Sequence, residues 1–383
     1  MNGFDLIIID EASQLPTNYL MAALQMVLPF TSTVNAPDSV DASMVNELTL
    51  ENPPSPDNIT RLVLVGDHNQ LPPISQVEPP EKLKHLIDSS FFYYLETHLA
   101  GTAPAQVALQ YNYRSHADIV TCIKLLGLYN ELWPAKNHAT NLKRIPLDIP
   151  THIHTPWLRS LLQRECVVNT IVHESPLDTV FSKTEAAITV DVILAYFQLC
   201  APKDTQGEID FWDQQLGVVS PHNAHGSLII RGVQEGLTTP HRLTHLDDDD
   251  LQEKLVGCIT SVDKFQGSAR DFIIGTMGIS ADDQLRSEET FFYDINRFNV
   301  LISRAKSKML LICSRNFAMY TPSDIKLLPI ASKIRQYVYD VCQHTGFEYT
   351  VVNGSQSVTM ELRTMPNSDF SPPNTTYTDQ AHE

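Results

Sequence analysis

Short apolar runs alternate with longer amphipathic stretches along the chain, and this alternation predicts its secondary structure. Runs rich in isoleucine, leucine and valine stand at residues 5–9, 62–65, 167–172, 216–219, 272–276 and 309–313. Short continuous runs of this kind are typical of strands buried on both faces. Apolar positions at helical spacing predict helices at residues 20–28, 91–95, 115–129, 182–197 and 295–306, with a further helix ending at 236. Strands that alternate with helices indicate an α/β fold with parallel sheets.

Four segments do not follow this alternation. Residues 31–58 contain four prolines and no periodicity, which predicts a surface insertion. Residues 101–105 have the composition of a junction between domains, and the acidic run 247–250 that of a solvated loop. Residues 354–383 are rich in serine, threonine, asparagine and proline, which predicts a disordered tail.

Two predicted helices begin with a capping signal. Ser182 is followed three residues later by Glu185, and Ser115 is followed at the same spacing by Asp118. In a capping box, the hydroxyl of the capping residue accepts from the backbone N–H three residues later. The acidic side chain at that later position reaches back to the backbone N–H of the capping residue. We therefore expect helices to start at both serines.

Composition narrows the classes of protein that the chain can represent. Of the 383 residues, 43% are hydrophobic and 19% are charged, which is a globular composition. No apolar run approaches 18 residues, so neither a membrane span nor a secretory signal is predicted. The six cysteines are dispersed, as expected for reduced thiols in an intracellular protein of the cytoplasm or nucleus. The formal net charge of −18 means that any nucleic acid would need a locally basic or polar surface.

Polar chemistry first occurs at the end of the first strand, where residues 6–14 read LIIIDEASQ. Open α/β sheets bind ligands at the carboxyl edge of their strands. Asp10 is a candidate to hold Mg²⁺ and Glu11 to orient an attacking water, as in P-loop nucleotide hydrolases. Taken alone, an acidic pair after a strand is equally compatible with a solvated surface.

The second strand repeats this form, because residues 62–73 read LVLVGDHNQLPP. Gly66 allows the turn, and Gln70 is a candidate to reach a phosphate. Together with the DEAxQ segment, this sequence resembles motifs II and III of superfamily 1 helicases. The resemblance implies that Gln14, Gly66 and Asp67 belong to the nucleotide site.

Four further segments follow in the order of that family: residues 111–115 (YNYRS), 217–225 (GVVSPHNAH), 261–271 (SVDKFQGSARD) and 297–306 (RFNVLISRAK). The resemblance implies that Arg114 and Arg304 reach the γ-phosphate of ATP. Guanidinium groups suit this role, since phosphoryl transfer depends mainly on charge neutralisation. The resemblance also places Gln266, Gly267 and Arg297 at the nucleotide. Single-stranded nucleic acid is expected to contact four residues that offer hydroxyl, imidazole, amide or backbone groups: Ser220, His222, Asn223 and Thr260.

The VDKFQG and RFNVLISRAK forms look most like one branch of the superfamily, that of the nonsense-mediated-decay RNA helicases and the replication helicase-nuclease. The resemblance implies tandem RecA-like P-loop NTPase lobes, with ATP and Mg²⁺ as cofactors and 5′ to 3′ movement on single-stranded RNA or DNA. We expect a partial, truncated first lobe at residues 1–100, which carries motifs II and III, and a second lobe at 103–345. The second lobe is expected to be monomeric.

The sequence departs from the family pattern at several points. No GxxxxGKS or GxxxxGKT occurs, so the phosphate-binding P-loop, or Walker A motif, is absent from these 383 residues. Ala269 stands where the branch commonly has a glutamate that binds ribose, and His225 stands where the family has a glutamine. Lys306 and Lys308 either add local charge or lie at a solvated helix end.

Two functional hypotheses follow. The first is the C-terminal part of an ATP-dependent helicase that is inactive as an isolated chain, because it lacks the P-loop. The alternative is a non-catalytic module that binds nucleic acid or protein. The combination of Asp10, Glu11, Gln70, Arg114 and Arg304 favours the first, since a module without catalysis has no need of these residue types together. Another kind of P-loop hydrolase does not account for two arginines in the late motifs.

Overall fold

The computed structural model describes residues 6–20, 61–73, 90–99, 107–135, 146, 148–175, 178–265, 267–353 and 356–366. The chain divides into two compact units, Met1–Val107 and Ala108–Glu383, and each is described by itself. Most of the predicted helix at 20–28, the predicted insertion at 31–58 and the predicted junction at 101–105 lie outside the described residues.

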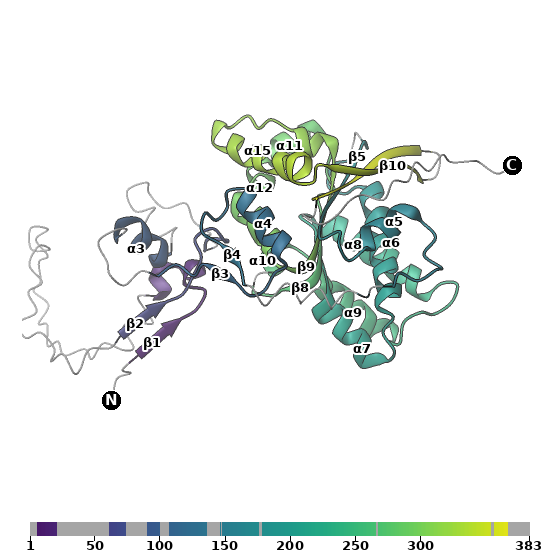
Figure 1. Ribbon diagram of the computed structural model, residues 1–383, viewed down its shortest axis with the longest axis horizontal. Coiled ribbons are helices and arrows are strands. Elements are labelled where there is room, and N and C mark those ends of the chain that lie inside the picture. The colour runs from purple at the N-terminus through teal and green to yellow at the C-terminus, as the bar shows by residue number, and fades with distance from the viewer. Residues whose placement is uncertain are drawn as a thin grey trace, which may run out of the picture. The chain divides into compact units, whose positions relative to one another are not determined.

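The first unit contains two parallel strands that are neighbours in a sheet. Strand β1 (Leu6–Ile9) pairs with β2 (Arg61–Leu64), with Leu6 opposite Arg61 and Ile9 opposite Leu64. A short 3₁₀ helix, η1 (Ala12–Gln14), follows β1, and α3 (Phe91–Leu99) packs against it (Figure 1). Parallel pairing places the two carboxyl ends, which carry the predicted nucleotide residues, at the same edge.

The prediction that these first strands are buried on both faces is wrong for the described residues. Leu6 is 51% exposed and Ile8 62%, and Val63 and Val65 on the neighbouring strand are also exposed. Side chains alternate between faces along a strand. These four apolar side chains therefore share one face of the pair, which the described residues leave open, while the alternate positions are half-buried.

The second unit is built on a parallel-dominated sheet. Its strand order is β10-β11-β5-β9-β8-β6-β7, in which β5, β9, β8, β6 and β7 run parallel. The two strands at one end are β10 (His344–Asn353) and β11 (Gln356–Thr364). The strand bounds are β5 Val168–His173, β6 Leu216–Val219, β7 Ile259–Thr260, β8 Arg270–Thr276 and β9 Ala305–Ser314. All five lie at or near predicted apolar runs or motif segments, so the mixed α/β fold with a parallel sheet is as predicted. A separate pair of short parallel strands is formed by β3 (Tyr111–Asn112) and β4 (Trp133–Pro134).

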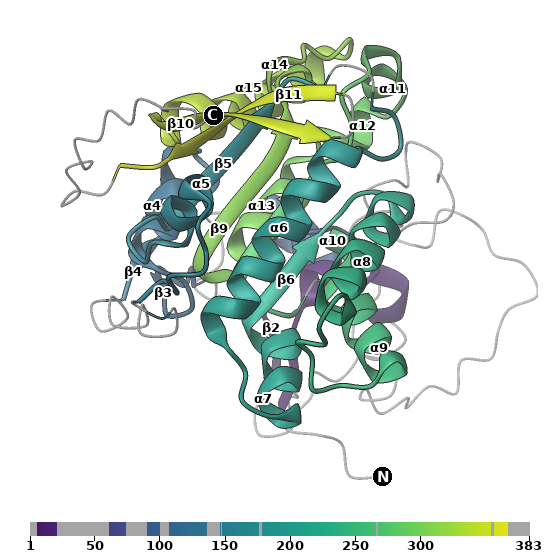
Figure 2. The ribbon, with the colours of Figure 1, turned by 90° about the vertical axis from the view of Figure 1, so that its right-hand side faces the viewer.

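Helices cover both faces of this sheet, as Figures 1 and 2 show. On one face lie α5 (Pro156–Leu162), α6 (Lys183–Cys200), α8 (Asn223–Thr238) and α9 (Asp248–Cys258). On the other, α4 (Ala117–Leu125) and α13 (Ile295–Ser303) pack on β9. The remaining helical elements are α7 Thr205–Asp210, η6 Phe211–Gln215, α10 Val262–Phe265, α11 Asp282–Ser287, α12 Glu289–Phe292, α14 Arg315–Met319, η7 Ile325–Leu327, α15 Leu328–Gln336 and η8 Tyr337–Val341.

A large apolar core lies between the sheet and the α6 face. Aromatic rings meet there edge to face: Tyr196 lies 5.1 Å from Phe272 on β8, and Phe197 lies 5.2 Å from Phe211. Helices α6 and α8 approach closely at Gly232, where an added Cβ would lie 2.8 Å from Val190. This core fixes the sheet whose two edges carry the predicted functional residues.

The predicted disordered tail is wrong over its first part. Residues Gln356–Thr364 form β11, which pairs antiparallel with both β5 and β10 (His344–Asn353). Val358, Met360 and Leu362 alternate along β11 and are buried. Their period of two is a strand signal that the many serines and threonines nearby obscure. Residues 367–383 lie outside the described part.

Two helix starts also differ from their predicted form. The acidic run is not a loop, because Asp247 caps α9 by accepting from the backbone N–H of Asp250 at 2.8 Å. Its neighbours lie in the first turn, where the helix dipole favours negative charge. Helix α4 begins one residue later than predicted: His116, and not Ser115, is the cap, and its Nδ1 accepts from the Asp118 N–H at 3.2 Å.

Candidate functional site

Backbone hydrogen bonds join the two predicted nucleotide loops of the first unit. The Val65 N–H donates to Ile9 O at 2.9 Å, and the Ala12 N–H donates back to Val65 O at 2.8 Å. The hydroxyl of Ser13 accepts from the Asp67 N–H at 3.2 Å. The loops after β1 and β2 are therefore held together as one surface.

Gly66 is required by this close approach. A Cβ at its position would lie 2.8 Å from the backbone nitrogen of Ser13, which real Cβ contacts do not reach. Beyond it, the carboxylate of Asp67 accepts from the side chain of Gln70 at 2.9 Å and from the Asn69 N–H at 3.0 Å. The glycine thus serves packing between loops, and Asp67 orders the turn that carries Gln70.

Glu11 adopts an unusual backbone conformation. Its φ of 51° lies in the left-handed region that non-glycine residues rarely enter. The Asp10 carboxylate accepts from the Glu11 N–H at 2.9 Å, and the Gln14 side chain donates to the Glu11 carboxylate at 2.7 Å. Asp10 and Glu11 are both exposed. The acidic pair and Gln14 thus form a local cluster at the carboxyl end of β1.

In the second unit, the loop that carries Arg114 is fixed at both ends. The Asn112 side chain accepts from the backbone N–H groups of Arg114 and Ser115, both at 2.8 Å. Next along the chain, the His116 N–H donates to Lys306 O at 2.7 Å. Since Arg304 precedes Lys306 by two residues and Arg114 precedes His116 by two, this bond brings the segments of the two predicted catalytic arginines together.

Arg304 itself is only 2% exposed and ends α13 at the start of β9. Its backbone oxygen accepts from the Arg270 N–H at 3.1 Å, so the segment leading into β8 is attached to it as well. Arg114, by contrast, is exposed. The structure brings the segments of these two arginines together and places their guanidinium groups in different environments, one buried and one in solvent.

Arg297 links two motif segments through its side chain. The guanidinium lies 3.6 Å from Asp263 on α10 and 3.6 Å from Asp294, which caps α13. It also stacks over the ring of Phe291, 4.4 Å from its centroid. Gly267 has a φ of 77°, which favours glycine, and Gln266 lies outside the described residues.

The predicted nucleic-acid residues lie where β6 and β7 end. The Ser220 N–H donates to Thr260 O at 3.0 Å, which places these two residues side by side. Ser220 is buried, and its hydroxyl donates to His222 O at 3.2 Å. His222 lies 3.2 Å from the Glu288 carboxylate and packs against Phe292, whereas Asn223 is exposed in the first turn of α8.

These residues and the arginine segments lie at opposite edges of the sheet. Strands β6, β8 and β9 are parallel neighbours. Arg270 begins β8 and Arg304 immediately precedes β9, so both mark the amino edge, while Ser220 follows β6 at the carboxyl edge. The segment that contains helix α10 (Val262–Phe265) runs from Thr260 at the carboxyl edge to Arg270 at the amino edge.

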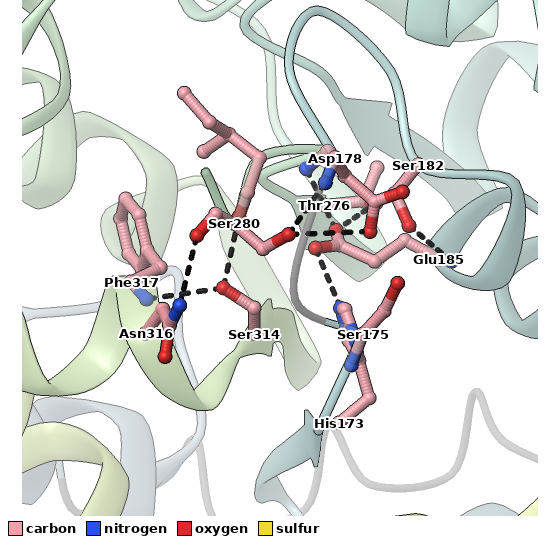
Figure 3. A network of polar contacts seen from close by, with 12 residues as sticks. His173, Ser175, Asp178, Ser182, Glu185, Thr276, Ser280, Ser314, Asn316 and Phe317 are labelled. Carbon is pink, nitrogen blue, oxygen red and sulfur yellow. Dashed lines mark hydrogen bonds and ion pairs between the residues drawn. The ribbon is translucent and has the colours of Figure 1, made fainter. Parts of the chain in front are cut away.

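A buried polar network, which the sequence did not predict, lies at the carboxyl edge (Figure 3). The Glu185 carboxylate accepts from the Thr276 hydroxyl at 2.9 Å and from the Gly278 N–H at 2.8 Å, and it lies 2.9 Å from Nε2 of His173. Glu185, His173 and Thr276 are fully buried. Ser182 accepts from the Glu185 N–H at 3.0 Å, so only half of the predicted capping box forms, because the carboxylate turns into the fold instead.

Backbone donors fix the tautomers of both histidines in this network. The Ser175 N–H donates to Nδ1 of His173 at 3.1 Å, and the Ser182 N–H donates to Nδ1 of His225 at 3.3 Å. An Nδ1 that accepts carries no proton, so each ring presents Nε2–H. His173 then donates to Glu185, and His225 donates to the Thr276 hydroxyl at 2.9 Å. Each N–H or O–H group in this series of hydrogen bonds therefore has an acceptor.

The network gives a structural reason why histidine can stand at position 225, where the helicase family has a glutamine. A glutamine side chain offers an oxygen that accepts and a nitrogen that donates, which are the two functions of Nδ1 and Nε2–H here. His225 is fully buried and its side chain makes both contacts inside the fold, two residues beyond the exposed Asn223. Gly278, with a φ of 70°, leaves room for the ring, since an added Cβ would lie 2.8 Å from it.

Lys308 is neither a surface charge nor part of a solvated helix end. It is fully buried in β9, and its Nζ donates to Leu161 O at 3.0 Å, to Gln163 O at 2.9 Å and to Cys166 O. Burial lowers the pKa of Lys308 to about 8. The ammonium group takes the place of a cap at the end of α5, where backbone oxygens have no partner within the helix.

Among the described residues, no cluster of three or more His, Cys, Asp or Glu side chains is arranged to hold a metal ion. Magnesium is commonly held by one or two carboxylates together with nucleotide phosphates, and the exposed carboxylate of Asp10 fits that donor set. None of the described helices combines the length and the apolar character needed to cross a membrane.

The parallel α/β sheet and its linked motif segments define the C-terminal region of a superfamily 1 helicase. The AAA domain family matches residues 87–316, which is more than half of the chain, and the chain belongs to that family.

Two individual relatives are each about a quarter identical to the chain in sequence. The DNA replication ATP-dependent helicase/nuclease DNA2 of Saccharomyces cerevisiae is 24% identical over 315 residues, which cover 78% of this chain and 18% of the relative. The ATP-dependent helicase upf1 of Schizosaccharomyces pombe is 25% identical over 256 residues, which cover 66% of this chain and 24% of the relative. The chain therefore spans less than a quarter of the length of either. A solved helicase, arterivirus nonstructural protein 10, is 14% identical with a TM-score of 0.26, covering 82% of this chain and 53% of that one.

The first prediction concerns His225. Substitution by alanine leaves the Ser182 N–H and the Thr276 hydroxyl without this partner, and we expect a loss of about 3 kcal/mol of unfolding free energy. His225→Gln keeps an acceptor and a donor, so its cost is expected to be about 1 kcal/mol. Urea denaturation followed by circular dichroism measures both. Equal destabilisation by the two variants would show that the hydrogen bonds at His225 do not matter.

The second prediction concerns the pH dependence of stability. Burial and the nearby charge of Lys308 lower the pKa of His116 from 6.5 to about 4. The unfolded chain therefore takes up this proton first, and stability falls as the pH drops from 6.5 towards 4, by up to about 3 kcal/mol. His116→Asn keeps a capping oxygen but does not titrate, so denaturation midpoints should fall less steeply over this range.

The exposed His241 provides the matched control. His241→Asn should leave the pH profile of the parent chain unchanged. A His116→Asn profile with the parental slope between pH 6.5 and 4 would contradict the assignment.

Proposed function

We propose that this chain contributes the C-terminal part of an ATP-dependent motor that moves along single-stranded nucleic acid. The proposal rests above all on the linkage of the predicted motif segments, through the His116–Lys306 and Arg270–Arg304 hydrogen bonds and the Arg297–Asp263 ion pair. The two relatives compared above are named as ATP-dependent helicases. Because the chain spans only a small part of each, the activity of the whole protein is a proposal.

In this proposal the residues that serve ATP are those that the motif sequences imply. Asp10 would hold a magnesium ion that accompanies ATP, and Glu11 would orient the attacking water. Gln14, Gly66, Asp67 and Gln70 would line the nucleotide beside them. Magnesium supplies charge neutralisation for the phosphates. Arg114 and Arg304 stabilise the charge on the γ-phosphate, as guanidinium groups do in phosphoryl transfer. Gln266, Gly267 and Arg297 complete the nucleotide contacts.

The strand side uses the carboxyl edge of the second unit. Ser220, His222, Asn223 and Thr260 are proposed to contact the backbone of single-stranded nucleic acid. The exposed Asn223 and the first-turn N–H groups of α8 supply donors for phosphate oxygens. His222 participates only after leaving Glu288, which lies 3.2 Å away. Few cationic side chains are involved, so the salt dependence of binding is expected to be modest.

Helix α10 gives the two sides a physical connection. It leaves the strand side at Thr260, carries Asp263, which pairs with Arg297 on α13, and ends near Arg270, whose N–H bonds to Arg304. In this proposal, a movement of α10 relative to α13 alters both edges at once. We propose that ATP hydrolysis and strand movement are coupled along this path.

The third prediction concerns hydrolysis by the isolated chain. The 383 residues contain no GxxxxGKS or GxxxxGKT, so the N–H cradle and the lysine for the phosphates are missing from this sequence. We expect little or no ATP turnover by the purified chain, with or without a single-stranded oligonucleotide, in a phosphate-release assay. Strong, strand-stimulated turnover that Glu11→Gln abolishes would contradict this expectation.

The fourth prediction concerns binding to a strand. Asn223→Ala removes an exposed amide at the proposed strand site and should weaken binding of a fluorescent single-stranded oligonucleotide by about five-fold. Anisotropy titration measures the effect, with Asn130→Ala, another exposed asparagine, as the control. If both variants bind like the parent chain, the strand does not lie at α8. If the chain binds no strand at all, the proposed function fails.

A further inference from the structure

The start of helix α8 is attached to the fold on both sides of Asn223, the exposed residue at the proposed strand site. On one side, the Ser220 hydroxyl donates to His222 O at 3.2 Å. On the other side, His225 is fully buried, and both of its ring nitrogens make hydrogen bonds. Asn223 lies between these two attachments, so its position at the surface depends on both.

Thr276, the last residue of β8, supplies the attachment of His225 to the sheet. Its hydroxyl accepts from Nε2–H of His225 at 2.9 Å and donates to the Glu185 carboxylate at 2.9 Å (Figure 3). A hydroxyl has one hydrogen to donate, and Glu185 receives it here, so the lone pairs of the oxygen are left for the imidazole. The Glu185 carboxylate thus orients the hydroxyl that holds His225.

The imidazole ring has little freedom to move around this hydrogen bond. The Ser182 N–H donates to Nδ1 of His225 at 3.3 Å, and an added Cβ at Gly278 would lie 2.8 Å from the ring. Without the Thr276 acceptor, a buried N–H would lose its partner, which costs more than the hydrogen bond itself contributes. The ring could recover an acceptor only by moving, and the first turn of α8 would move with it.

Thr276 cannot contact a nucleic-acid strand in this fold. Its side chain is fully buried, whereas Asn223 is exposed. Any effect of Thr276 on strand binding must therefore pass through His225 and the first turn of α8.

We propose that Thr276 is a positioning residue for strand binding. Its hydroxyl holds His225, and the first turn of α8 then presents Asn223 to a phosphate of the strand. The proposal rests on the proposed function, since it requires the strand to lie at the start of α8. It adds a residue that lies outside the motif segments, between residues 261–271 and 297–306.

The test removes the hydroxyl and keeps the shape of the side chain. Thr276→Val should weaken binding of a fluorescent single-stranded oligonucleotide to the full 383-residue chain by about five-fold, which is the loss expected for Asn223→Ala. Thr276→Ser keeps the hydroxyl and should bind like the parent chain. Anisotropy titration measures the three affinities at one salt concentration and one pH.

A double variant shows whether Thr276 acts through Asn223. If the hydroxyl serves to position this amide, Thr276→Val combined with Asn223→Ala should bind about five-fold more weakly than the parent chain, as each single variant does. Independent effects would multiply to a loss of about 25-fold.

Thr170→Val is the matched control for loss of a buried hydroxyl. Thr170 is fully buried on β5 of the same sheet, and its hydroxyl donates to Leu311 O on β9 at 3.0 Å. Thr170→Val should lower the thermal midpoint and leave strand affinity unchanged, because its hydrogen bond joins β5 to β9 and does not involve α8. A merely structural role of Thr276 would give it the same result.

The outcomes separate this inference from the proposed function. Binding like the parent chain by folded Thr276→Val overturns the inference and leaves strand binding intact. Equal weakening by Thr170→Val, or a loss of about 25-fold in the double variant, also overturns it. If the parent chain binds no strand, the proposed function fails together with the inference. If Asn223→Ala alone binds like the parent chain, the inference fails with the proposed strand contact.

A second pair of variants decides the question if Thr276→Val does not fold, which circular dichroism checks. His225→Gln keeps a donor for the Thr276 hydroxyl and should bind the strand like the parent chain. His225→Ala removes that donor and should bind about five-fold more weakly. Equal binding by these two variants overturns the inference.

Discussion

The carboxylate of Glu185 is the contact on which the carboxyl edge of the larger sheet depends. A buried charge is tolerated only when it is fully hydrogen-bonded, and here three donors meet it, from β5, from β8 and from the turn after β8. Through Thr276 the same network reaches His225 on α8. One carboxyl group thereby fixes the ends of two strands and the starts of two helices.

This network determines where the residues proposed to contact a nucleic-acid strand lie at the carboxyl edge. The first turn of α8 carries the exposed Asn223, and its position follows from the attachment of His225 to the sheet. At the other edge, backbone hydrogen bonds serve the same purpose for the arginine segments. Rigid elements thus hold both candidate surfaces, and α10 is the short segment that spans them.

The sequence predicted the parallel sheet well because its strands are continuous apolar runs, as at residues 216–219 and 309–313. It did not predict the Glu185 network. The Ser182 cap is local, but the acceptor role of Glu185 depends on Thr276, which lies 91 residues further along the chain. Likewise, nothing local to Lys308 signals that three backbone oxygens would enclose its ammonium group. Local patterns predict elements, whereas these contacts depend on how distant segments meet.

The candidate site shows the same division. The motif sequences made Arg114 and Arg304 candidates, but they did not predict that one is exposed while the other is buried. The strand β11 was missed because its polar residues outweigh the alternation of Val358, Met360 and Leu362. Its pairing with β5 arises from contact with a strand more than 180 residues earlier, which no local window contains.

The left-handed backbone of Glu11 has a consequence for how this position can evolve. A non-glycine residue in that region is disfavoured by about 1 kcal/mol or more, so glycine is the residue that local folding energy would select. The chain retains a carboxylate there, with φ at 51°. Under the proposed role of Glu11 in orienting water, selection for foldability and selection for chemistry oppose each other at this single residue, and drift towards glycine would mark a lineage in which that role is no longer maintained.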